Sequence, residues 1–315
     1  MRRLITLLAA AILAALPLGA VQTGAESAPE KTGTRSYEQL APFEALDVSW
    51  VYQVELQRSD RCSVSVTAPQ SILQYLKVGV SNGKLTLSVE NLSRDIQRQV
   101  EVLLRHSEVK AVVSMPTLSG IEIHGAAKLS ATGSFSTPKD RFSLKMSGAT
   151  AISGLAVQAR SADIQGSGAA KFDLLGDFRE LKLTLSGAVS GSLASGQLSE
   201  PVQDAVLRLS GAVKFTLSSR IEELNLESSG AVSFSMTGSA GKLSARGSGA
   251  SSFELIEAPA EQARISLSGA AKASLAVNRT LDVKLGGAAT CRYKAGAACR
   301  ITIQEVSRGA SLKRL

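Results

Sequence analysis

The chain of 315 residues is 44% hydrophobic but only 4% aromatic, and its 35 basic and 27 acidic residues give a formal net charge of +8. A mild basic excess with so few aromatic side chains argues against a nucleic-acid-binding protein. The two histidines, His106 and His124, have no partners at metal-ligand spacing, so we expect neither a metal site nor a cofactor.

The N-terminus resembles a secretory signal. Arg2 and Arg3 precede an apolar run from residue 4 to 16, and small residues follow, so we expect residues 1–25 to be a signal peptide cleaved after Ala20 or Ala25. The run is too short to be a membrane span, and we expect no transmembrane span after cleavage. The sequence therefore predicts export to the periplasm, the cell surface or the medium.

Residues 26–36 are polar and are predicted to be a linker, and residues 37–116 form an N-terminal β-rich region. Residues 81–83, Ser-Asn-Gly, predict a tight turn, and residues 69–76 predict a short helix. The predicted strands cover residues 43–49, 51–57, 62–68, 76–80, 84–90, 100–105 and 109–115. This region either extends the fold that follows or caps it, because an open sheet end invites aggregation.

Residues 117–315 contain a repeat that is anchored by glycine. Ten glycines lie 18 to 24 residues apart, each is followed by alanine, and seven are preceded by serine. A period near twenty is typical of a stacked-repeat protein. The repeat glycines are Gly125, Gly148, Gly168, Gly187, Gly211, Gly230, Gly249, Gly269, Gly287 and Gly309.

Apolar and polar residues alternate on both sides of each repeat glycine, which is strand periodicity. Each unit is therefore a strand, a corner of small residues, a second strand and a return. The pattern predicts an all-β fold, a single-stranded right-handed β-helix or β-solenoid of about ten coils. Glycine allows a positive φ at the corner, and the serine hydroxyls form a ladder or bond the local backbone. A buried aromatic ladder is expected from Phe172, Phe215, Phe234 and Phe253.

Several segments together resemble one known family. They are FEALDVSWVYQVELQ, APQSILQYLKVGVSNGKLTLSV, MPTLSGIEIHGAAKL, the Ser-Gly-Ala units, and the stretch from LGGAATCRYK to the C-terminus. The chain is similar over about residues 40–315 to the head GIN domain family, which is called putative auto-transporter adhesin. The resemblance implies a β-helical exported or surface protein of bacteria, and it assigns no functional residues.

Charged side chains recur at fixed offsets from the glycine. Three residues before it, Arg208, Glu227 and Arg246 fall on consecutive coils, as do Glu122 and Lys145, and we expect cross-strand ion pairs there. Three residues after it lie Lys128, Lys171, Lys214 and Lys272, separated by small residues. These lysines form either a solvated face that opposes aggregation or a stripe that binds an anionic glycan or a lipid surface.

Export permits disulfides, and Cys291 and Cys299 lie eight residues apart, so a bridge between them is a candidate, which leaves Cys62 over. No cluster of acids marks a catalytic site. The sequence predicts a non-catalytic, adhesin-like binding or scaffolding protein of the bacterial envelope, with an envelope glycan or a surface protein as partner. The alternative is a carbohydrate-active enzyme, a polysaccharide lyase or hydrolase, on the same fold.

Overall fold

The computed structural model describes residues 31–90, 92–105, 107–195 and 200–315. The predicted signal peptide, residues 26–30 of the predicted linker, and His106 lie outside the described residues. The prediction of a linker is wrong for residues 32–36, because β1 (Thr32–Tyr37) is an edge strand antiparallel to β4 (Ser63–Pro69). Backbone hydrogen bonds hold such a strand, so it needs little apolar surface of its own.

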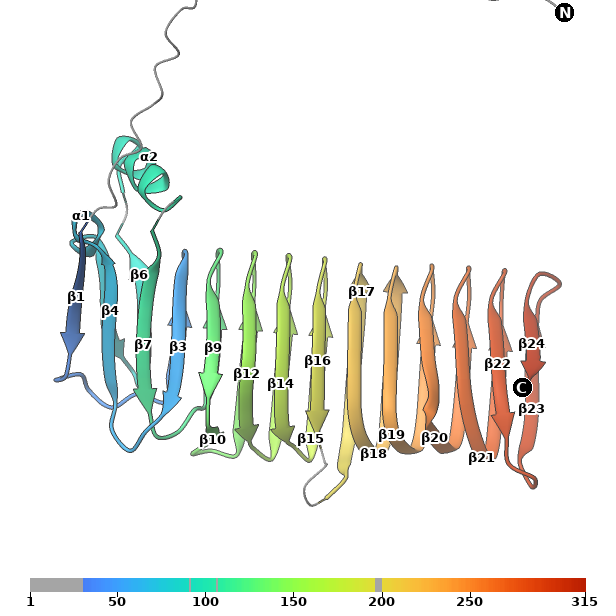
Figure 1. The fold of residues 1–315 in the computed structure, drawn as a ribbon. Coiled ribbons are helices and arrows are strands. Elements are labelled where there is room, and N and C mark those ends of the chain that lie inside the picture. Colours follow the sequence, from blue (N-terminus) through green and yellow to red (C-terminus); the bar gives the residue numbers. More distant parts are fainter. Residues whose placement is uncertain (1–30, 91, 106, 196–199) are drawn as a thin grey trace, which may run out of the picture.

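The chain forms a β-solenoid of about ten coils, as the repeat predicts, with two parallel sheets along its length (Figure 1). The pre-glycine sheet holds the strands that lead into a repeat glycine, and the post-glycine sheet holds those that follow it. The chain turns between the sheets at the glycine edge and returns at the opposite, return edge.

The strands of the pre-glycine sheet, in stacking order, begin with β6 (Lys84–Val89), β2 (Ala45–Val48), β8 (Gly120–Ile123), β11 (Arg141–Met146), β13 (Ser161–Gly166), β15 (Glu180–Leu185) and β17 (Val202–Gly211), and the sheet ends with β23 (Arg300–Val306). Those of the post-glycine sheet begin with β7 (Val109–Met115), β3 (Tyr52–Arg58), β9 (Lys128–Thr132) with β10 (Ser134–Ser136), β12 (Ala151–Gln158), β14 (Lys171–Asp177) and β16 (Ser190–Ser195), and end with β22 (Thr290–Ala295) and β24 (Ser311–Arg314). Between these sets, four long strands run through both sheets: β18 (Lys214–Gly230), β19 (Ser233–Gly247), β20 (Ser252–Leu267) and β21 (Lys272–Leu285).

The N-terminal region both extends the solenoid and caps it. The strands β6 and β7 lie outside β2 and β3, although they come later in the chain, and β8 and β9 pair with the other side of β2 and β3. Beyond them, β4 and β1 add to one sheet, and β5 (Leu76–Ser81) adds to the other, each antiparallel to its neighbour. The cap therefore contains two strands, β4 and β5, that run against their neighbours in the coils, and β1, which reverses direction once more.

Two local predictions for this region are confirmed and one is wrong. Asn82 and Gly83 both have positive φ in the tight turn between β5 and β6, and α1 (Gln70–Leu73) is the short helix. The strand predicted at residues 100–105 is instead part of α2 (Arg94–Leu103), which lies at the glycine edge (Figure 1). Ser93 caps this helix by accepting a hydrogen bond from the Ile96 N–H group at 3.5 Å.

The repeat glycines stack directly on one another at the glycine edge. From Gly125 to Gly287 their φ values lie between +65° and +89°. At each step the N–H group of the alanine after one glycine donates to the carbonyl of the glycine one coil earlier; Ala212 N and Gly187 O are 2.8 Å apart. A Cβ atom on Gly211 would lie 2.6 Å from Gly187 O, so a side chain at this corner would clash with the backbone of the coil before it. Gly309 stacks on Gly287 without the positive φ.

The corner stack begins with Trp50, a residue other than glycine with φ +73°. Trp50 O accepts from Ala126 N at 2.7 Å, so it occupies the glycine position of the first coil. Three of the serines before the glycines, Ser167, Ser210 and Ser248, donate to backbone carbonyls of the preceding coil, and Ser167 Oγ is 3.2 Å from Met146 O. His124 occupies the first serine position, and its Nδ1 is 2.7 Å from Ser147 Oγ.

Leucine, isoleucine, valine, alanine and phenylalanine fill the space between the two sheets. Phe172, Phe215 and Phe234 form ring contacts with centroids 6.0 and 6.1 Å apart, and Phe253 is buried on the next coil. Gly191 lies between Phe172 and Phe215 in the register, and the absence of its side chain lets those two rings meet. The predicted aromatic ladder is therefore present.

The predicted bridge between Cys291 and Cys299 is not formed, and all three cysteines are free thiols. Cys291 is buried at the start of β22, whereas Cys299 follows the turn after that strand. Four strand residues from Cys291 to Ala295 cover about 13 Å. Cys299 lies beyond the far end of that strand, after the turn at Gly296, whereas a disulfide spans a Cα distance of only about 7 Å.

We expect Gly211→Ala to lower the free energy of unfolding by about 2 kcal/mol or more, because the new methyl group combines a positive φ with a backbone clash. Gly79→Ala is the matched control, since a Cβ there meets nothing within 4 Å, and it should change stability by less than about 0.5 kcal/mol. Urea denaturation measures both. Equal stability of the two variants would contradict the corner packing.

Thiol labelling distinguishes the three cysteines. Burial raises the pKa of the Cys291 thiol to about 12, so almost no thiolate forms there at mildly alkaline pH. We expect the partly exposed Cys62 and Cys299 to react in the folded protein, and Cys291 only in denaturant, as read by intact mass. Labelling of Cys62 alone under both conditions would instead indicate a bridge between the other two cysteines.

Candidate interaction surface

The outer face of the post-glycine sheet carries lysines in one continuous row. Strand register brings Lys128, Lys171, Lys214 and Lys272 onto a single line across the strands, and all four side chains are exposed. Lys110 on β7 extends this line beyond Gln53, although the sequence analysis did not select it. We call these five residues the lysine row.

The lysine row has a regular spacing over most of its length. One residue separates each neighbouring pair from Lys110 to Lys214: first Gln53, then Ala151, then Ser190. Those charges therefore recur at about 9.6 Å, twice the strand spacing. Lys272 follows three strands after Lys214, beyond Ser233 and Ser252.

Four members of the row form no close ion pair with a described acid, although the charge of Lys128 also helps to lower the pKa of Glu108. Among the described residues, Lys128, Lys171, Lys214 and Lys272 form no ion pair within 4.0 Å. Lys110 pairs with Glu108 at 3.1 Å, and hydrogen bonds from Gln53 and Lys110 hold the pKa of Glu108 below its usual value. The charge of the row is thus largely free to act on a ligand.

The outer face of the pre-glycine sheet has the opposite character, because most of its cations are paired. Glu227 bridges Arg208 at 3.5 Å and Arg246 at 3.4 Å, and Glu122 bridges Lys84 at 3.3 Å and Lys145 at 3.2 Å. Further pairs join Lys182 to Asp163, Lys242 to Glu223, Arg264 to Asp282 and Lys284 to Glu305. The ion pairs predicted from the sequence are present.

Glu122 lies at the centre of one such group. Its partial burial acts to raise the pKa of the carboxyl group, but hydrogen bonds from Lys145 and Lys84 outweigh burial and lower the pKa. Exposed pairs of this kind contribute about 0.2–1 kcal/mol each to stability. The pre-glycine face is thus a neutralised surface that holds the coils in register.

A second outward row next to the lysine row is rich in hydroxyl groups. Ser192 Oγ donates to Asp173 at 2.6 Å, and the hydroxyls of Thr216 and Ser235 are 3.1 Å apart. The hydroxyl residues of this row are Ser130, Ser153, Ser192, Thr216, Ser235 and Ser274. The post-glycine face therefore places hydroxyl groups, together with the carboxylates of Glu55, Asp173 and Glu254 in the same row, beside the lysines.

The face is hollowed at the N-terminal end of the lysine row. A groove of about 720 Å³ lies between the residues after α2 and strands β3, β7 and β9. Its lining includes Lys110, Lys128, Gln53 and Thr67, so two neighbouring members of the lysine row share this groove. The groove could not be predicted from the sequence, because it depends on the position of β7 outside β3.

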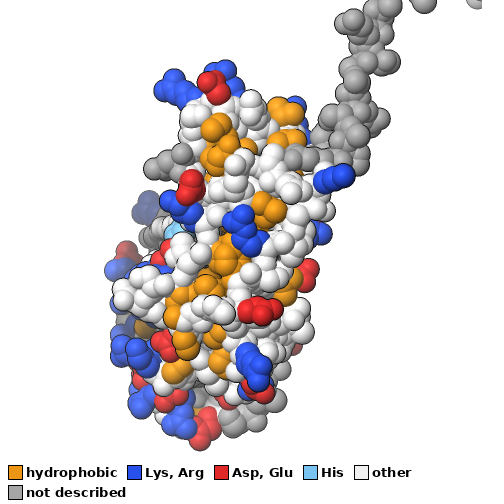
Figure 2. All heavy atoms as spheres, turned by 90° about the vertical axis from the view of Figure 1, so that its left-hand side faces the viewer, with side chains coloured by type: hydrophobic (Ala, Val, Ile, Leu, Met, Phe, Trp, Pro, Cys, Tyr) orange, Lys and Arg blue, Asp and Glu red, His pale blue; other side chains and the backbone are white. Residues whose placement is uncertain are grey.

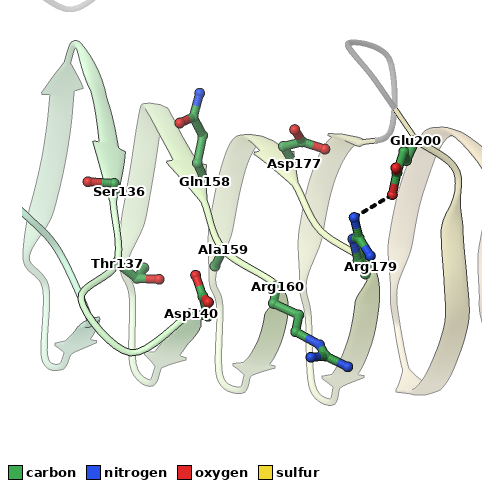
Figure 3. A pocket seen from close by; sticks show the side chains of 9 residues that line it. All are labelled: Ser136, Thr137, Asp140, Gln158, Ala159, Arg160, Asp177, Arg179 and Glu200. Carbon is green, nitrogen blue, oxygen red and sulfur yellow. Dashed lines mark ion pairs between the residues drawn. The ribbon is translucent and has the colours of Figure 1, made fainter.

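A second groove of about 610 Å³ lies on the return edge (Figure 3). Arg179 and Glu200 form an ion pair of 2.6 Å in it, and Asp140 and Asp177 come from different coils. Thr137 also lines this groove, and its Oγ1 atom is buried without a hydrogen-bond partner among the described residues. An exposed leucine, Leu175, lies in the adjoining hollow.

The described part of the chain contains no group of three or more metal-ligating side chains that could hold an ion. Within the same residues, no helix has the length and apolar character needed to cross a membrane. Burial of Tyr52 raises the pKa of its hydroxyl, which donates to Ser88 O at 3.1 Å, so this group serves the core.

Similarity to solved structures is low in sequence but extends over most of the chain. A putative adhesin from Parabacteroides merdae shares 13% identity and a TM-score of 0.48, with 90% of this chain and 96% of that chain covered. A putative adhesin from Parabacteroides distasonis shares 15% identity and a TM-score of 0.45, with coverage of 90% and 97%. A putative lipid binding protein from the same species shares 14% identity and a TM-score of 0.40, with coverage of 90% and 96%.

No curated protein matches the chain. The family model described as "Putative auto-transporter adhesin, head GIN domain" matches residues 42–200 and 194–297. These two matches span most of the chain, including the N-terminal coils and nearly all of the glycine repeat. The protein therefore belongs to the head GIN domain family of putative auto-transporter adhesins.

Proposed function

We propose that this protein is an exported, non-catalytic adhesin that binds an extended anionic polymer of the bacterial envelope along the lysine row. The observation that carries the proposal is the contrast between the two faces. Most cations of the pre-glycine face are paired with acids, with Arg141 and Arg300 as exceptions, whereas four lysines in register on the post-glycine face form no ion pair with a described residue. Membership of an adhesin family supports a binding role.

The spacing of the row suits a linear ligand. Lys110, Lys128, Lys171 and Lys214 recur at about 9.6 Å along a straight rod. A polymer whose negative charges recur at about 10 Å, twice the strand spacing, can contact them in sequence without bending. An acidic polysaccharide with one charge in every second sugar has this character, and the row of hydroxyl groups beside the lysines suits its sugar hydroxyls.

The competing explanation is that the lysines only keep the face solvated and prevent lateral association. Both explanations require exposed lysines, but they differ in the response to an anionic polymer. If the lysine row binds a ligand, removal of its charge lowers the affinity of the protein for the polymer. If the lysines only keep the face solvated, removal of their charge promotes aggregation, and the protein binds no polymer with or without them.

We expect replacement of Lys128, Lys171, Lys214 and Lys272 by serine to weaken binding to immobilised anionic polysaccharide by about tenfold or more at low salt. The physical reason is that unpaired charges attract the polymer and their attraction is screened by salt. Retention on a hyaluronate or polygalacturonate matrix over a salt gradient measures the effect.

The matched control replaces four paired lysines by serine: Lys145, Lys182, Lys242 and Lys284. It removes the same formal charge from the other face, so its retention should stay close to that of the unmodified protein. Equal loss of retention in both variants would show that only net charge matters and would contradict the proposed site.

The return-edge groove is the place where an enzyme of the polysaccharide lyase or hydrolase kind would have its acids, since it holds Asp140 and Asp177. We expect no cleavage, because Asp140 and Asp177 lie on coils two apart with Ala159 and Arg160 between them. Incubation of the protein with polygalacturonate, followed by chain-length analysis, tests this. Cleavage that is lost in Asp140→Asn would overturn the non-catalytic role.

A further inference from the structure

An apolar hollow opens on the post-glycine face beside the return-edge groove. Its volume is about 380 Å³, and its lining includes Leu175 on β14. Leu175 is 57% exposed, and among the described residues between α2 and β23 it is the only large hydrophobic side chain that is exposed. We call this feature the leucine hollow.

Small residues on the neighbouring strands leave the space around Leu175. Ala156 on β12 and Ala194 on β16 pair with Leu175 in register, and both are half-buried. Gly176 follows Leu175, and a Cβ atom there would collide with the ring of the buried Phe178. A ligand that lies over either alanine can therefore contact the side of Leu175.

Packing of the protein core does not explain this exposed leucine. Figure 2 shows the cap end of the rod, where hydrophobic side chains form a band between charged ones. At that end Val78 and Val80 are half-buried and pack against the core. Leu175 instead follows the buried Leu174 on its strand, so its side chain faces away from the core.

Polar side chains border the leucine hollow toward the return edge. Gln158 and Asp177 pair in register two residues after Ala156 and Leu175, and both line the hollow as well as the return-edge groove. Two strand residues separate the polar pair from the apolar pair by about 6.6 Å. Gln158 makes no side-chain hydrogen bond within the described residues, so its amide can both donate to a ligand and accept from it.

The return-edge groove continues this polar surface. Figure 3 shows the Thr137 hydroxyl and the Asp140 carboxylate directed toward the same part of the groove, and both belong to one turn. Thr137 is 8% exposed, and its Oγ1 atom has no partner among the described residues, whereas buried hydroxyl groups normally have one. This indicates a ligand with hydrogen-bonding groups.

The charges of the groove disfavour an anionic ligand. Its two arginines are paired, Arg160 with Glu180 at 3.7 Å and Arg179 with Glu200 at 2.6 Å. The remaining charged residues of its lining are both aspartates. The groove therefore differs from the lysine row in the sign of its charge, and a neutral ligand avoids repulsion by the carboxylates.

We propose that the leucine hollow and the adjoining part of the return-edge groove bind an N-acetylhexosamine unit of a glycan. The acetyl methyl group contacts Leu175, the amide N–H donates to Asp177, and the amide carbonyl accepts from Gln158. Sugar hydroxyls donate to the oxygen atoms of Asp140 and Thr137. A plain hexose has no methyl group for the hollow, and neither has a sugar with a free amine. This inference does not rest on the lysine row.

The test uses the full chain and three trisaccharides: the trimer of N-acetylglucosamine, cellotriose and the trimer of glucosamine. We expect the N-acetylated trimer to bind with a Kd of about 1 mM or tighter, as measured by calorimetry, and the other two at least about tenfold more weakly. Saturation-transfer NMR should show the strongest signal at the acetyl methyl group. Equal binding of cellotriose, stronger binding of the glucosamine trimer, or no binding of the N-acetylated trimer overturns the proposal.

Two substitutions locate the site. Leu175→Ser and Gln158→Ala should each weaken binding of the N-acetylated trimer by about fivefold or more, because one removes the apolar contact and the other the amide. The matched controls are Val102→Ser, at a side chain that is 58% exposed, and Gln57→Ala, at an exposed glutamine of β3. Both controls should bind as the unmodified protein does. Equal loss in a variant and its control contradicts the site.

Salt separates this site from the lysine row. Binding of a neutral trisaccharide should change by less than about twofold between low and high salt, because no net charge is attracted. Retention on an anionic polysaccharide should fall over the same range. Trisaccharide binding that is abolished by salt overturns the proposal, and binding that persists while retention is lost supports it.

Discussion

The hydrogen bond from the alanine N–H of one coil to the glycine carbonyl of the coil before it is the constraint on which the rest of this structure depends. It requires the two backbones to approach so closely that a Cβ atom on the glycine would clash, and it recurs from Trp50 to Gly287. Because every coil is fixed to the next at this corner, residues at equal offsets from the glycine align across the rod. Both the lysine row and the ion pairs of the opposite face are products of that alignment.

Counting from the glycine was enough to predict much of the fold and part of the surface. The alternation of apolar residues predicted the strands, and the offset of three residues placed Arg208, Glu227 and Arg246 on adjacent strands, where they pair. The same counting put Lys128, Lys171, Lys214 and Lys272 in one line. These predictions succeed because they depend only on the offset of a residue from its repeat glycine, and the stacked corners place residues of equal offset on neighbouring strands in register.

Features that depend on chain order or on tertiary contacts could not be predicted in this way. Lys110 has no repeat glycine near it, so its place in the row follows only from the pairing of β7 with β3. The helix α2 was mistaken for a strand because Val100 and Val102 alternate with polar neighbours over a short run. The cysteine bridge failed because Cys291 lies near the start of β22, whereas Cys299 lies beyond the end of that strand, after a turn.

The position of β2 and β3 has a consequence for the order in which the chain folds. Although they are the first coil of the chain, they lie between a coil made from β6 and β7 and another made from β8 and β9. The chain therefore cannot wind steadily from its N-terminus, since both flanks of its first coil wait for segments that emerge later. Once residues up to about the end of β9 are in place, a closed template exists, and each later coil needs only its immediate predecessor. The coils formed by β2, β3 and β6 to β9 thus fold as one cooperative unit, and each later coil adds to the coil before it.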